Sequence, residues 1–349
     1  MVPTEGRYRL LYVKLTWVHD EANPGAGSYV VLNFTGVHHL CDGGTVLPFS
    51  EWATTCRNLC DKGRLQCSEN VYTMDVTVLR GRRAQEPLPA PLAKRMFIPV
   101  EAVLGAPKPD FPTVTARVNF PNSVLEQMQK HLQHAVTKSG RALSKNDVMH
   151  AIVWHKMIEI FGPQVTHDGK HSTMFFPADM RGRYPGIGRN HIGDATSINA
   201  VEVEAETVTL KECAQKFHDE ARSGASVEYF REQLDFEASR KPESRVHGFF
   251  TPAWPTLITT SVRHGPIYEG RFGGKMGSEG PINFSFVRPS LVVIPPYRRP
   301  NPTEEQKDWE SGNDMQITIP LGQDETAAAK FVASLPKGTR LLSIWSIDL

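Results

Sequence analysis

This sequence has almost no net charge and no long hydrophobic run. Its 349 residues include 39 lysines and arginines against 38 aspartates and glutamates, which leaves a net charge of +1. This balance gives no argument for nucleic acid or an anionic membrane surface as a partner. No stretch approaches the roughly 18 continuous apolar residues of a membrane span, and the polar start, Met1 to Arg9, lacks the apolar core of a secretory signal. We therefore expect a cytoplasmic protein that binds neither nucleic acid nor membrane.

Cysteine is also sparse, and its five copies are odd in number. Secreted disulfide frameworks use paired cysteines, so this count favours a reducing, cytosolic setting with free thiols. Cys56 and Cys60 are one helical turn apart and Cys67 follows, a spacing that would suit zinc. The sequence has no paired CxxC and no histidine at a fitting distance, so we expect thiols here and no metal.

The first part of the chain shows strand and helix patterns. Residues 10–18 alternate between apolar and polar side chains, and residues 29–37 are apolar on both faces. Asn23-Pro24-Gly25 lies between them and is a typical turn sequence, so the two strands are predicted to form a hairpin. The helix expected from about Thr45 carries one apolar stripe, formed by Val46, Phe49, Trp52, Cys56 and Leu59.

Prolines gather between residues 87 and 112, where seven of them occur. Proline at this density blocks helix interiors and strand pairing. We therefore divide the chain into residues 1–95, a proline-rich crossover linker at 96–112, and a C-terminal part at 113–349.

Strands and helices alternate in the C-terminal part, which predicts an α/β fold with mixed sheets. Asn122 or Ser123 would cap its first helix, and Ser144 with Asp147 would cap its second. The polar residues 300–312 are expected to form an exposed loop. Strands are expected at 114–120, 173–177, 197–203, 257–261, 291–294 and 315–319. Helices are expected at 122–136, 144–161, 210–221, 227–239 and 325–335.

The most informative segment is His38-His39-Leu40-Cys41-Asp42-Gly43-Gly44. It follows the second expected strand and precedes the expected helix, so His38 lies at a strand-to-helix corner. Histidine titrates near neutral pH and can accept a proton and return it, so a general base is one interpretation. Two others remain, a histidine that only bonds locally at the end of a strand and a metal ligand. The metal interpretation is weakened because neighbouring side chains of an extended segment point to opposite faces.

The block from Val30 to Arg57 resembles the active-site segment of the BAHD acyltransferases, a family of CoA-dependent enzymes with an HxxxD motif. In that pattern the base is the histidine four residues before the aspartate, which selects His38 with Asp42 and leaves His39 as a neighbour. Further segments resemble other motifs of the family in the same order. Leu143 to Ala151 resembles LSxNDxxxA, Pro177 to Arg183 resembles DxRxR, and Gly193-Asp194-Ala195 resembles Gly-Asn-Ala.

The resemblance implies a chloramphenicol-acetyltransferase-like fold with two lobes and mixed sheets. It also implies transfer of an acyl group from acyl-CoA to a hydroxyl or amine of a small, specialised metabolite, with His38 as general base. Acyl-CoA would be a co-substrate, no cofactor would be bound permanently, and the protein would be a monomer. In the family an arginine holds the motif aspartate, here Asp42, and the DxRxR match names Arg181, with Arg183 as second choice. Gly43 would keep the base accessible to the thioester.

Two departures from the family pattern keep a second hypothesis open. HxxxD lies much deeper in the chain of full-length members, so we expect an incomplete first lobe at 1–95, which carries the motif, and a C-terminal acyltransferase lobe at 113–349. The family's DFGWG motif is replaced by Arg271-Phe272-Gly273-Gly274-Lys275. The alternative is therefore a truncated, catalytically inactive acyltransferase-like protein. A metal-dependent or other hydrolase is the third hypothesis.

The oxyanion donor stays open at this point. Thr259, Thr260 and Ser261 offer hydroxyls on a strand that the family places near the boundary between the lobes. Most strand hydroxyls only bond to backbone or water, so we leave them unassigned, together with the residues that would bind the CoA phosphates.

Overall fold

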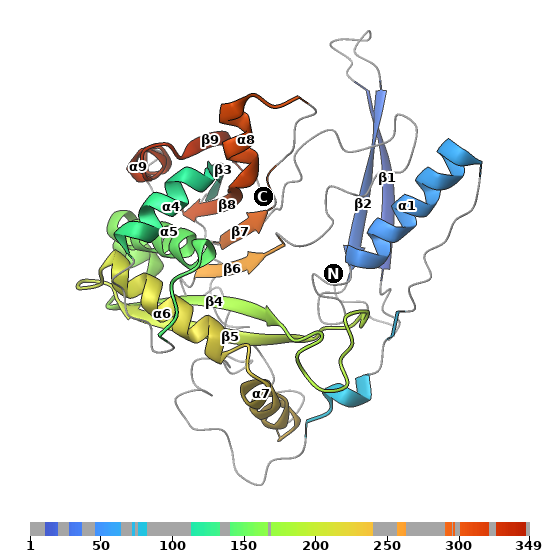
Figure 1. Ribbon diagram of the computed structural model, residues 1–349, viewed down its shortest axis with the longest axis horizontal. Helices are drawn as coiled ribbons and strands as arrows, with labels where there is room; N and C mark the ends of the chain where they lie inside the picture. Colours follow the sequence, from blue (N-terminus) through green and yellow to red (C-terminus); the bar gives the residue numbers. More distant parts are fainter. Residues whose placement is uncertain are drawn as a thin grey trace.

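The described part of the chain contains a two-stranded hairpin with one helix, and a seven-stranded sheet with helices on one face (Figure 1). The predicted linker at 96–112 and the segment from Arg271 to Lys275 lie outside the described residues, so the predicted domain bounds stay predictions. This computed structural model describes residues 11–19, 28–36, 46–63, 72–73, 76–81, 113–132, 140–166, 169–239, 257–262, 290–294, 296, 301–320 and 326–346.

The hairpin forms where the sequence predicts it. Strand β1 (Leu11–His19) pairs antiparallel with strand β2 (Ser28–Gly36), and the register places Leu11 opposite Gly36. Because β2 ends at Gly36, the histidine–aspartate motif follows a strand closely, as its interpretation as a strand-to-helix corner requires.

Helix α1 (Val46–Lys62) also lies where it is predicted. Its expected apolar stripe is wrong at two positions, because the side chains of Trp52 and Leu59 are 46% and 48% exposed. Ala53, which is outside the predicted stripe, is buried instead.

The seven strands of the large sheet lie in the order β5-β4-β6-β7-β8-β3-β9. Strand β6 is parallel to both β4 and β7, while the other neighbouring pairs are antiparallel. This confirms the predicted mixed sheet. The strands are β3 (Thr113–Phe120), β4 (His171–Asp179), β5 (Thr196–Glu204), β6 (Leu257–Ser261), β7 (Ser290–Ile294), β8 (Asn313–Pro320) and β9 (Arg340–Ser346).

Strand β9 is absent from the sequence prediction. It lies at the edge of the sheet and pairs with β3, with a register shift between Arg117 and Val118. Leu341, Leu342 and Ile344 are 43%, 38% and 50% exposed, so apolar side chains on both faces of β9 reach the surface. A strand with neither face in the core needs no alternation of apolar and polar residues, so its sequence carries no period-two signal.

Four of the described helices cover one face of the large sheet (Figure 1). The core between them contains alternate side chains of the strands, such as Val118 and Ile317, and side chains of the helices, such as Val153. On β5 every second residue from Ser197 to Val203 is buried, which is the period of a strand with one face in the core. The helices are α4 (Asn122–His131), α5 (Lys145–Phe161), α6 (Leu210–Ser223) and α9 (Ala327–Ser334).

Helix α7 (Val227–Ser239) covers the free edge of β5 instead of a sheet face. Tyr229 Oη donates to the carbonyl oxygen of Ile198 at 3.0 Å, and Gln233 Oε1 accepts from the amide of Ile198 at 3.1 Å. These side chains replace the hydrogen bonds that a further strand would make at this edge. Two short 3-10 helices are also described, η3 (Val76–Leu79) and η4 (Gly162–Val165).

Helix α5 is buried along most of its length and begins at the predicted capping pair. Ser144 Oγ accepts from the Asp147 amide at 3.2 Å, and Asp147 Oδ2 accepts from the Ser144 amide at 2.7 Å. The same carboxylate oxygen lies 2.8 Å from Nδ1 of His218 on α6. Arg222 Nε donates to Nε2 of His218 at 3.1 Å, so the ring proton is on Nδ1 and is donated to Asp147. The cap of α5 therefore also joins it to α6.

A second histidine, His150, is buried where α5, α6 and β6 meet. Its Nδ1 lies 2.8 Å from the carbonyl oxygen of Asn146, which can only accept, so Nδ1 carries the proton. Nε2 therefore accepts from Thr259 Oγ1 at 2.7 Å, and the ring stacks on Phe217 with centroids 4.6 Å apart. Burial lowers the pKa of His150 from its ordinary value of 6.5, against the opposing effects of the Asn146 carbonyl and the Asp147 carboxylate. The ring is therefore neutral.

The face of the sheet opposite the helices carries a buried charged network. Arg117 on β3 donates from both Nε and Nη2 to Asp314 Oδ2 on β8, at 3.1 and 2.7 Å. Asn119 Nδ2 donates to the other carboxylate oxygen at 2.7 Å. The register places Asn119 opposite Asp314 and Arg117 opposite Gln316, so these side chains project from one face, while the apolar residues between them face the helices. Both oxygens of the buried carboxylate are thus bonded.

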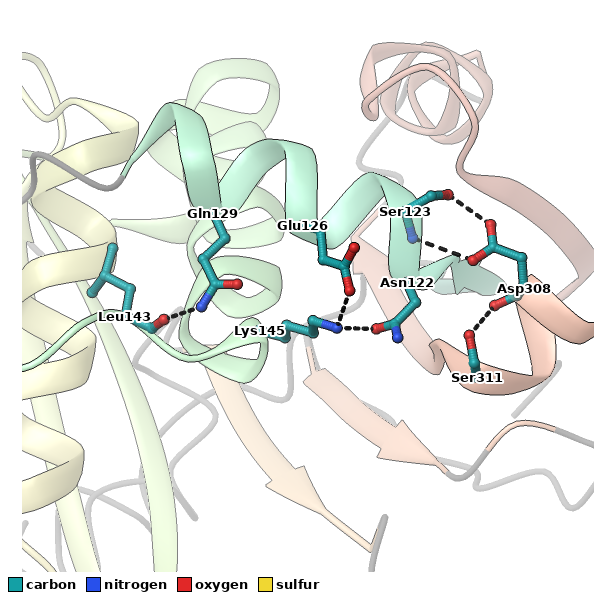
Figure 2. A network of polar contacts seen from close by, with 8 residues as sticks. All are labelled: Asn122, Ser123, Glu126, Gln129, Leu143, Lys145, Asp308 and Ser311. Atoms are coloured by element: carbon teal, nitrogen blue, oxygen red, sulfur yellow. Dashed lines mark hydrogen bonds and ion pairs between the residues drawn. The ribbon is translucent and has the colours of Figure 1, made fainter.

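Helix α4 begins differently from the prediction, which placed its cap at Asn122 or Ser123. Pro121 is the N-cap and makes no side-chain capping bond. Instead the amide and hydroxyl of Ser123 donate to Asp308 at 3.3 and 2.6 Å, as Figure 2 shows. Lys145 Nζ, at the start of α5, donates to Asn122 Oδ1 at 2.5 Å. The carboxylate that caps α4 comes from a segment far along the chain, so no local pattern could reveal it.

Asp308 lies in helix α8 (Glu304–Ser311), within the segment 300–312 that is predicted as an exposed loop. The predicted exposure is confirmed, but the predicted loop is wrong, because Thr303 and Gln306 form a capping box that starts a helix. No residue of α8 is buried, so the helix has no apolar stripe and the periodicity on which the prediction depends is missing. The cap residues were the available signal.

Replacing Asp314 by alanine should destabilise the fold strongly, because the Arg117 guanidinium would be left buried without this carboxylate. We expect the free energy of unfolding, measured with urea at neutral pH, to fall by about 3–5 kcal/mol. Glu304→Ala is the matched control, since the Lys307–Glu304 ion pair is exposed and its loss should change the free energy little. A loss for Asp314→Ala no larger than that of the control would contradict the prediction.

The neutral His150 predicts a loss of stability in acid. As the pH falls through 6.5, the unfolded chain takes up a proton at His150 while the folded ring does not, so stability present above about pH 6.5 is lost towards the lower folded pKa. In His150→Gln this contribution is removed, and the free energy of unfolding should fall less between about pH 7 and pH 5 than in the wild type. Equal slopes for His150→Gln and wild type would refute the assignment.

Candidate active site

The predicted base and its motif partner, His38 and Asp42, lie outside the described residues, together with Gly43. The structure does describe both flanking elements, since β2 ends at Gly36 and α1 begins at Val46. A strand before the motif and a helix after it are what the sequence predicts for this corner. The roles of the three residues stay predictions.

Arg181 is described, and it is buried just after the end of β4. Its Nε donates to the carbonyl oxygen of His191 at 2.6 Å, and its Nη2 donates to the carbonyl oxygen of Gly193. Its Nη1 donates to Asp179 Oδ1 at 3.1 Å. The side chain of Arg181 is 4% exposed, whereas that of Asp179 is 61% exposed. Two backbone carbonyls and a carboxylate fix the orientation of the planar guanidinium.

A turn separates the two arginines of the DxRxR match. Gly182 has a φ of 67°, in the left-handed region that favours glycine, and its amide donates to the carbonyl oxygen of Ile187 at 2.8 Å. Arg181 on one side of the turn is buried, and Arg183 on the other side is exposed. Which of the two arginines would bind Asp42 stays a prediction. The carboxylate itself stays a prediction.

The turn is anchored by a small apolar cluster that is separate from the main core. Val78 and Leu79 of η3 pack against it, so residues before the predicted linker contact the end of the large sheet. Because Met180 directly precedes Arg181, this cluster also fixes where the arginine side chain starts. The buried members of the cluster are Met180, Ile187, Ala195 and Phe230.

The sequence does not predict the partners of Arg181. Backbone carbonyls carry no residue-type signal, so His191 could not be found from its identity. Gly193 lies in the segment that resembles Gly-Asn-Ala, and the structure gives a physical reason for glycine there. A Cβ at this position would lie 2.8 Å from Nε2 of His191, which is closer than real Cβ contacts.

The strand hydroxyls left unassigned by the sequence have different surroundings. Thr259 faces the helices and donates to His150, so its role is structural. Thr260 projects from the opposite face of β6 and is half-buried, and Ser261 is exposed at the end of the strand. Of the three, Thr260 alone lies on the sheet face that is free of helices α4, α5, α6 and α9.

Within the described ranges, no group of three or more His, Cys, Asp or Glu side chains is arranged to hold a metal ion. The described cysteines, Cys56, Cys60 and Cys213, are free thiols, as predicted. Burial, with a smaller effect of Glu212, raises the pKa of Cys213 to about 12, so this thiol is protonated and unreactive at neutral pH. Among the helices that the structure describes, none has the length and apolar character of a membrane span.

No protein-family model matches this sequence, and no curated protein matches it either. Solved structures do resemble its fold. TRI101 of F. graminearum, complexed with coenzyme A and deoxynivalenol, aligns with a TM-score of 0.68 at 13% identity, over 96% of this chain and 70% of that chain. TRI101 of F. sporotrichioides, complexed with coenzyme A and T-2, has a TM-score of 0.63 at 14% identity over the same shares. Vinorine synthase has a TM-score of 0.54 at 14% identity, over 94% of this chain and 64% of that chain.

Identities this low show the fold alone. The alignments nevertheless include nearly the whole of this chain, and they agree with the mixed seven-stranded sheet described above. This chain spans 70% of the length of the TRI101 structures. The predicted fold class is therefore confirmed: the chain has an α/β, chloramphenicol-acetyltransferase-like fold with mixed sheets.

Proposed function

We propose that this protein is an acyltransferase that moves an acyl group from acyl-CoA to a hydroxyl or amine of a small, specialised metabolite. The proposal depends on the combination of a sequence motif and a fold. The HxxxD residues His38 and Asp42 follow strand β2 in a chain whose fold is similar, over 96% of its length, to a structure complexed with coenzyme A. Fold or motif alone would be weak support, because folds host many functions and HxxxD is a short pattern.

His38 is the general base in this proposal. Its imidazole removes the proton from the acceptor hydroxyl or amine, and the acceptor attacks the thioester carbonyl to form a tetrahedral intermediate. When the intermediate collapses, the carbon–sulfur bond breaks and the imidazolium returns the proton to the CoA thiolate. A CoA thioester is already activated, so donor and acceptor react directly in a ternary complex without a covalent enzyme intermediate.

Asp42 and Arg181 form a supporting ion pair in this proposal. What supports it is the buried guanidinium of Arg181, which is held at a fixed orientation by the carbonyls of His191 and Gly193. A carboxylate bound there would keep the corner between β2 and α1 in one conformation. Gly43, the next residue, would leave the approach to the base free of a side chain.

A second candidate is an acyltransferase-like protein without turnover. The sequence Arg271-Phe272-Gly273-Gly274, which replaces the DFGWG motif of the family, is the observation that favours it. Coenzyme A binding together with no thiol release, for every acyl-CoA and acceptor tried, would support this candidate and oppose the first.

The base can be tested by measuring free thiol release from acetyl-CoA and longer acyl-CoAs with a panel of alcohols and amines. His38→Ala should lower kcat by about 10²–10⁴-fold, the range that general acid–base catalysis contributes. His39→Ala is the matched control and should keep the wild-type rate. Turnover that survives His38→Ala would refute the role of His38.

The ion pair can be tested with a double-mutant cycle. Asp42→Ala should lower the free energy of unfolding by less than the about 3–5 kcal/mol of a fully stranded buried charge, because the Arg181 guanidinium keeps Asp179 and two carbonyls as partners. The double variant Asp42→Ala/Arg181→Ala should lose less than the sum of the single losses, because the interaction between the two side chains is counted in both single variants. Arg183→Ala, at an exposed position, should show no such coupling to Asp42→Ala. Additive losses for Asp42 and Arg181 would exclude the pair.

A further inference from the structure

Residues 72–73 and 76–81, named the strap here, lie between helix α1 and the loop that holds Arg181. Within its described residues the regular structure is limited to the single turn of η3 and one bridge. The position of the strap is therefore fixed by its contacts with other elements. One contact is with the loop that holds Arg181, and the other is with helix α1, which follows the HxxxD motif in the chain.

The first contact is a short backbone bridge. Thr73 pairs in parallel with His191. The amide of Thr73 donates to the carbonyl oxygen of Asn190 at 3.1 Å, and its carbonyl oxygen accepts from the amide of Ile192 at 2.8 Å. Two such bonds hold the backbones at the spacing of neighbouring strands, about 4.8 Å.

The loop that accepts this bridge also holds Arg181. The carbonyls of His191 and Gly193 accept from Arg181, and the groups that bond to Thr73 alternate with them along the chain. Successive residues of an extended chain direct their backbone groups to opposite sides. Residues 190–193 therefore bond to the strap on one side and to the guanidinium on the other. A shift of Thr73 moves the carbonyls that orient Arg181.

The second contact joins the strap to helix α1. Tyr72, the neighbour of Thr73, donates its phenol hydrogen bond to the carboxylate of Glu51. Burial and this hydrogen bond together raise the pKa of Tyr72 to about 12, so the phenol is a neutral donor at physiological pH. Glu51 lies in the second turn of α1, which begins at Val46, four residues after Asp42.

Two close approaches fix the rest of the strap. A Cβ on Gly186 would lie 3.0 Å from Val78 Cγ1, so the turn after β4 touches η3 directly. A Cβ on Gly81 would lie 1.9 Å from the carbonyl oxygen of Leu234 on α7, so only glycine allows the backbones to come this close. The strap thus contacts the helix after the motif, the loop of Arg181 and helix α7.

We propose that the strap is a positioning device, in which the Glu51–Tyr72 hydrogen bond and the Thr73–His191 bridge set the position of helix α1 relative to the Arg181 guanidinium. The inference rests on the proposed function, because it assumes that Asp42 pairs with Arg181. Tyr72 and Glu51 act through other residues and contact no substrate in this account. Their role is to connect the strap to helix α1 through one hydrogen bond, at a half-buried position.

The test uses Tyr72→Phe, which removes the phenol oxygen and keeps the ring. We expect kcat to fall about tenfold, as for a sub-ångström displacement of a site group, while KM for acyl-CoA is unchanged. The amide of Ile192 should exchange with deuterium faster, because the carbonyl of Thr73 no longer holds one position. Glu51→Leu should reproduce both effects. Glu51→Gln retains an acceptor for the phenol and should restore kcat and exchange to within about twofold of wild type.

Tyr229→Phe is the matched control. The phenol of Tyr229 also donates a hydrogen bond, to the carbonyl oxygen of Ile198, but Tyr229 lies on α7 at the edge of β5. Its variant should lose a similar amount of stability and leave kcat and the exchange of Ile192 as in the wild type. A merely structural role for Tyr72 would make the two variants behave alike.

The outcomes separate the two proposals. Wild-type kcat and wild-type exchange of Ile192 in Tyr72→Phe would overturn the strap as a positioning device. An equal fall in kcat for Glu51→Gln and Glu51→Leu would also overturn it, because glutamine keeps an acceptor for the phenol. If the wild-type protein turns over no donor and acceptor, the proposed function fails. The exchange of Ile192 then still decides whether the Glu51–Tyr72 bond holds the loop of Arg181.

Discussion

The burial of helix α5 is the constraint on which the rest of this structure depends. A helix enclosed by a sheet and by α6 can keep polar side chains only if each finds a partner, because an unpaired buried group costs about 1–3 kcal/mol. Asp147 bonds to His218, His150 to Thr259, and Trp154 Nε1 to Ser172. These bonds reach both neighbouring elements, so they fix the helix against the sheet in one register. The end of β4, and with it Arg181, takes its place from that arrangement.

Local signals predict the elements whose physics is local. The capping pair Ser144 and Asp147 marks the start of α5, and the alternation on β5 marks a strand with one face in the core. The failures have a common cause. The cap of α4 comes from Asp308, the helix α8 has no buried face, and β9 has both faces at the surface. The partner of α4 and the lack of a buried face on α8 and β9 are set by tertiary packing, which a short window of sequence does not contain. Helix α8 nevertheless had one local signal, its capping box.

The candidate site also has one part that the sequence predicts and one part that depends on tertiary contacts. Its motif residues and the choice of Arg181 come from the resemblance of two segments to the HxxxD and DxRxR motifs of the BAHD family, and the structure adds that Arg181 is buried. Its orientation depends on carbonyls of His191 and Gly193 and on the bridge to Thr73, more than 100 residues away in sequence. Backbone partners have no residue-type signature and long-range pairs have no spacing rule. These contacts therefore had to be read from the structure.

The strap also limits how the chain can change in length. Surface connections usually tolerate inserted or deleted residues. Between Thr73 and Gly81, however, both ends are fixed, one by a bridge to a specific pair of backbone groups and the other by an approach that only glycine permits. Adding or removing one residue there would put a side chain where Gly81 meets Leu234, or would offer the wrong carbonyl to Ile192. Among variants of this protein, the segment from Thr73 to Gly81 should therefore keep a constant length, while the identities of the residues between these two ends vary.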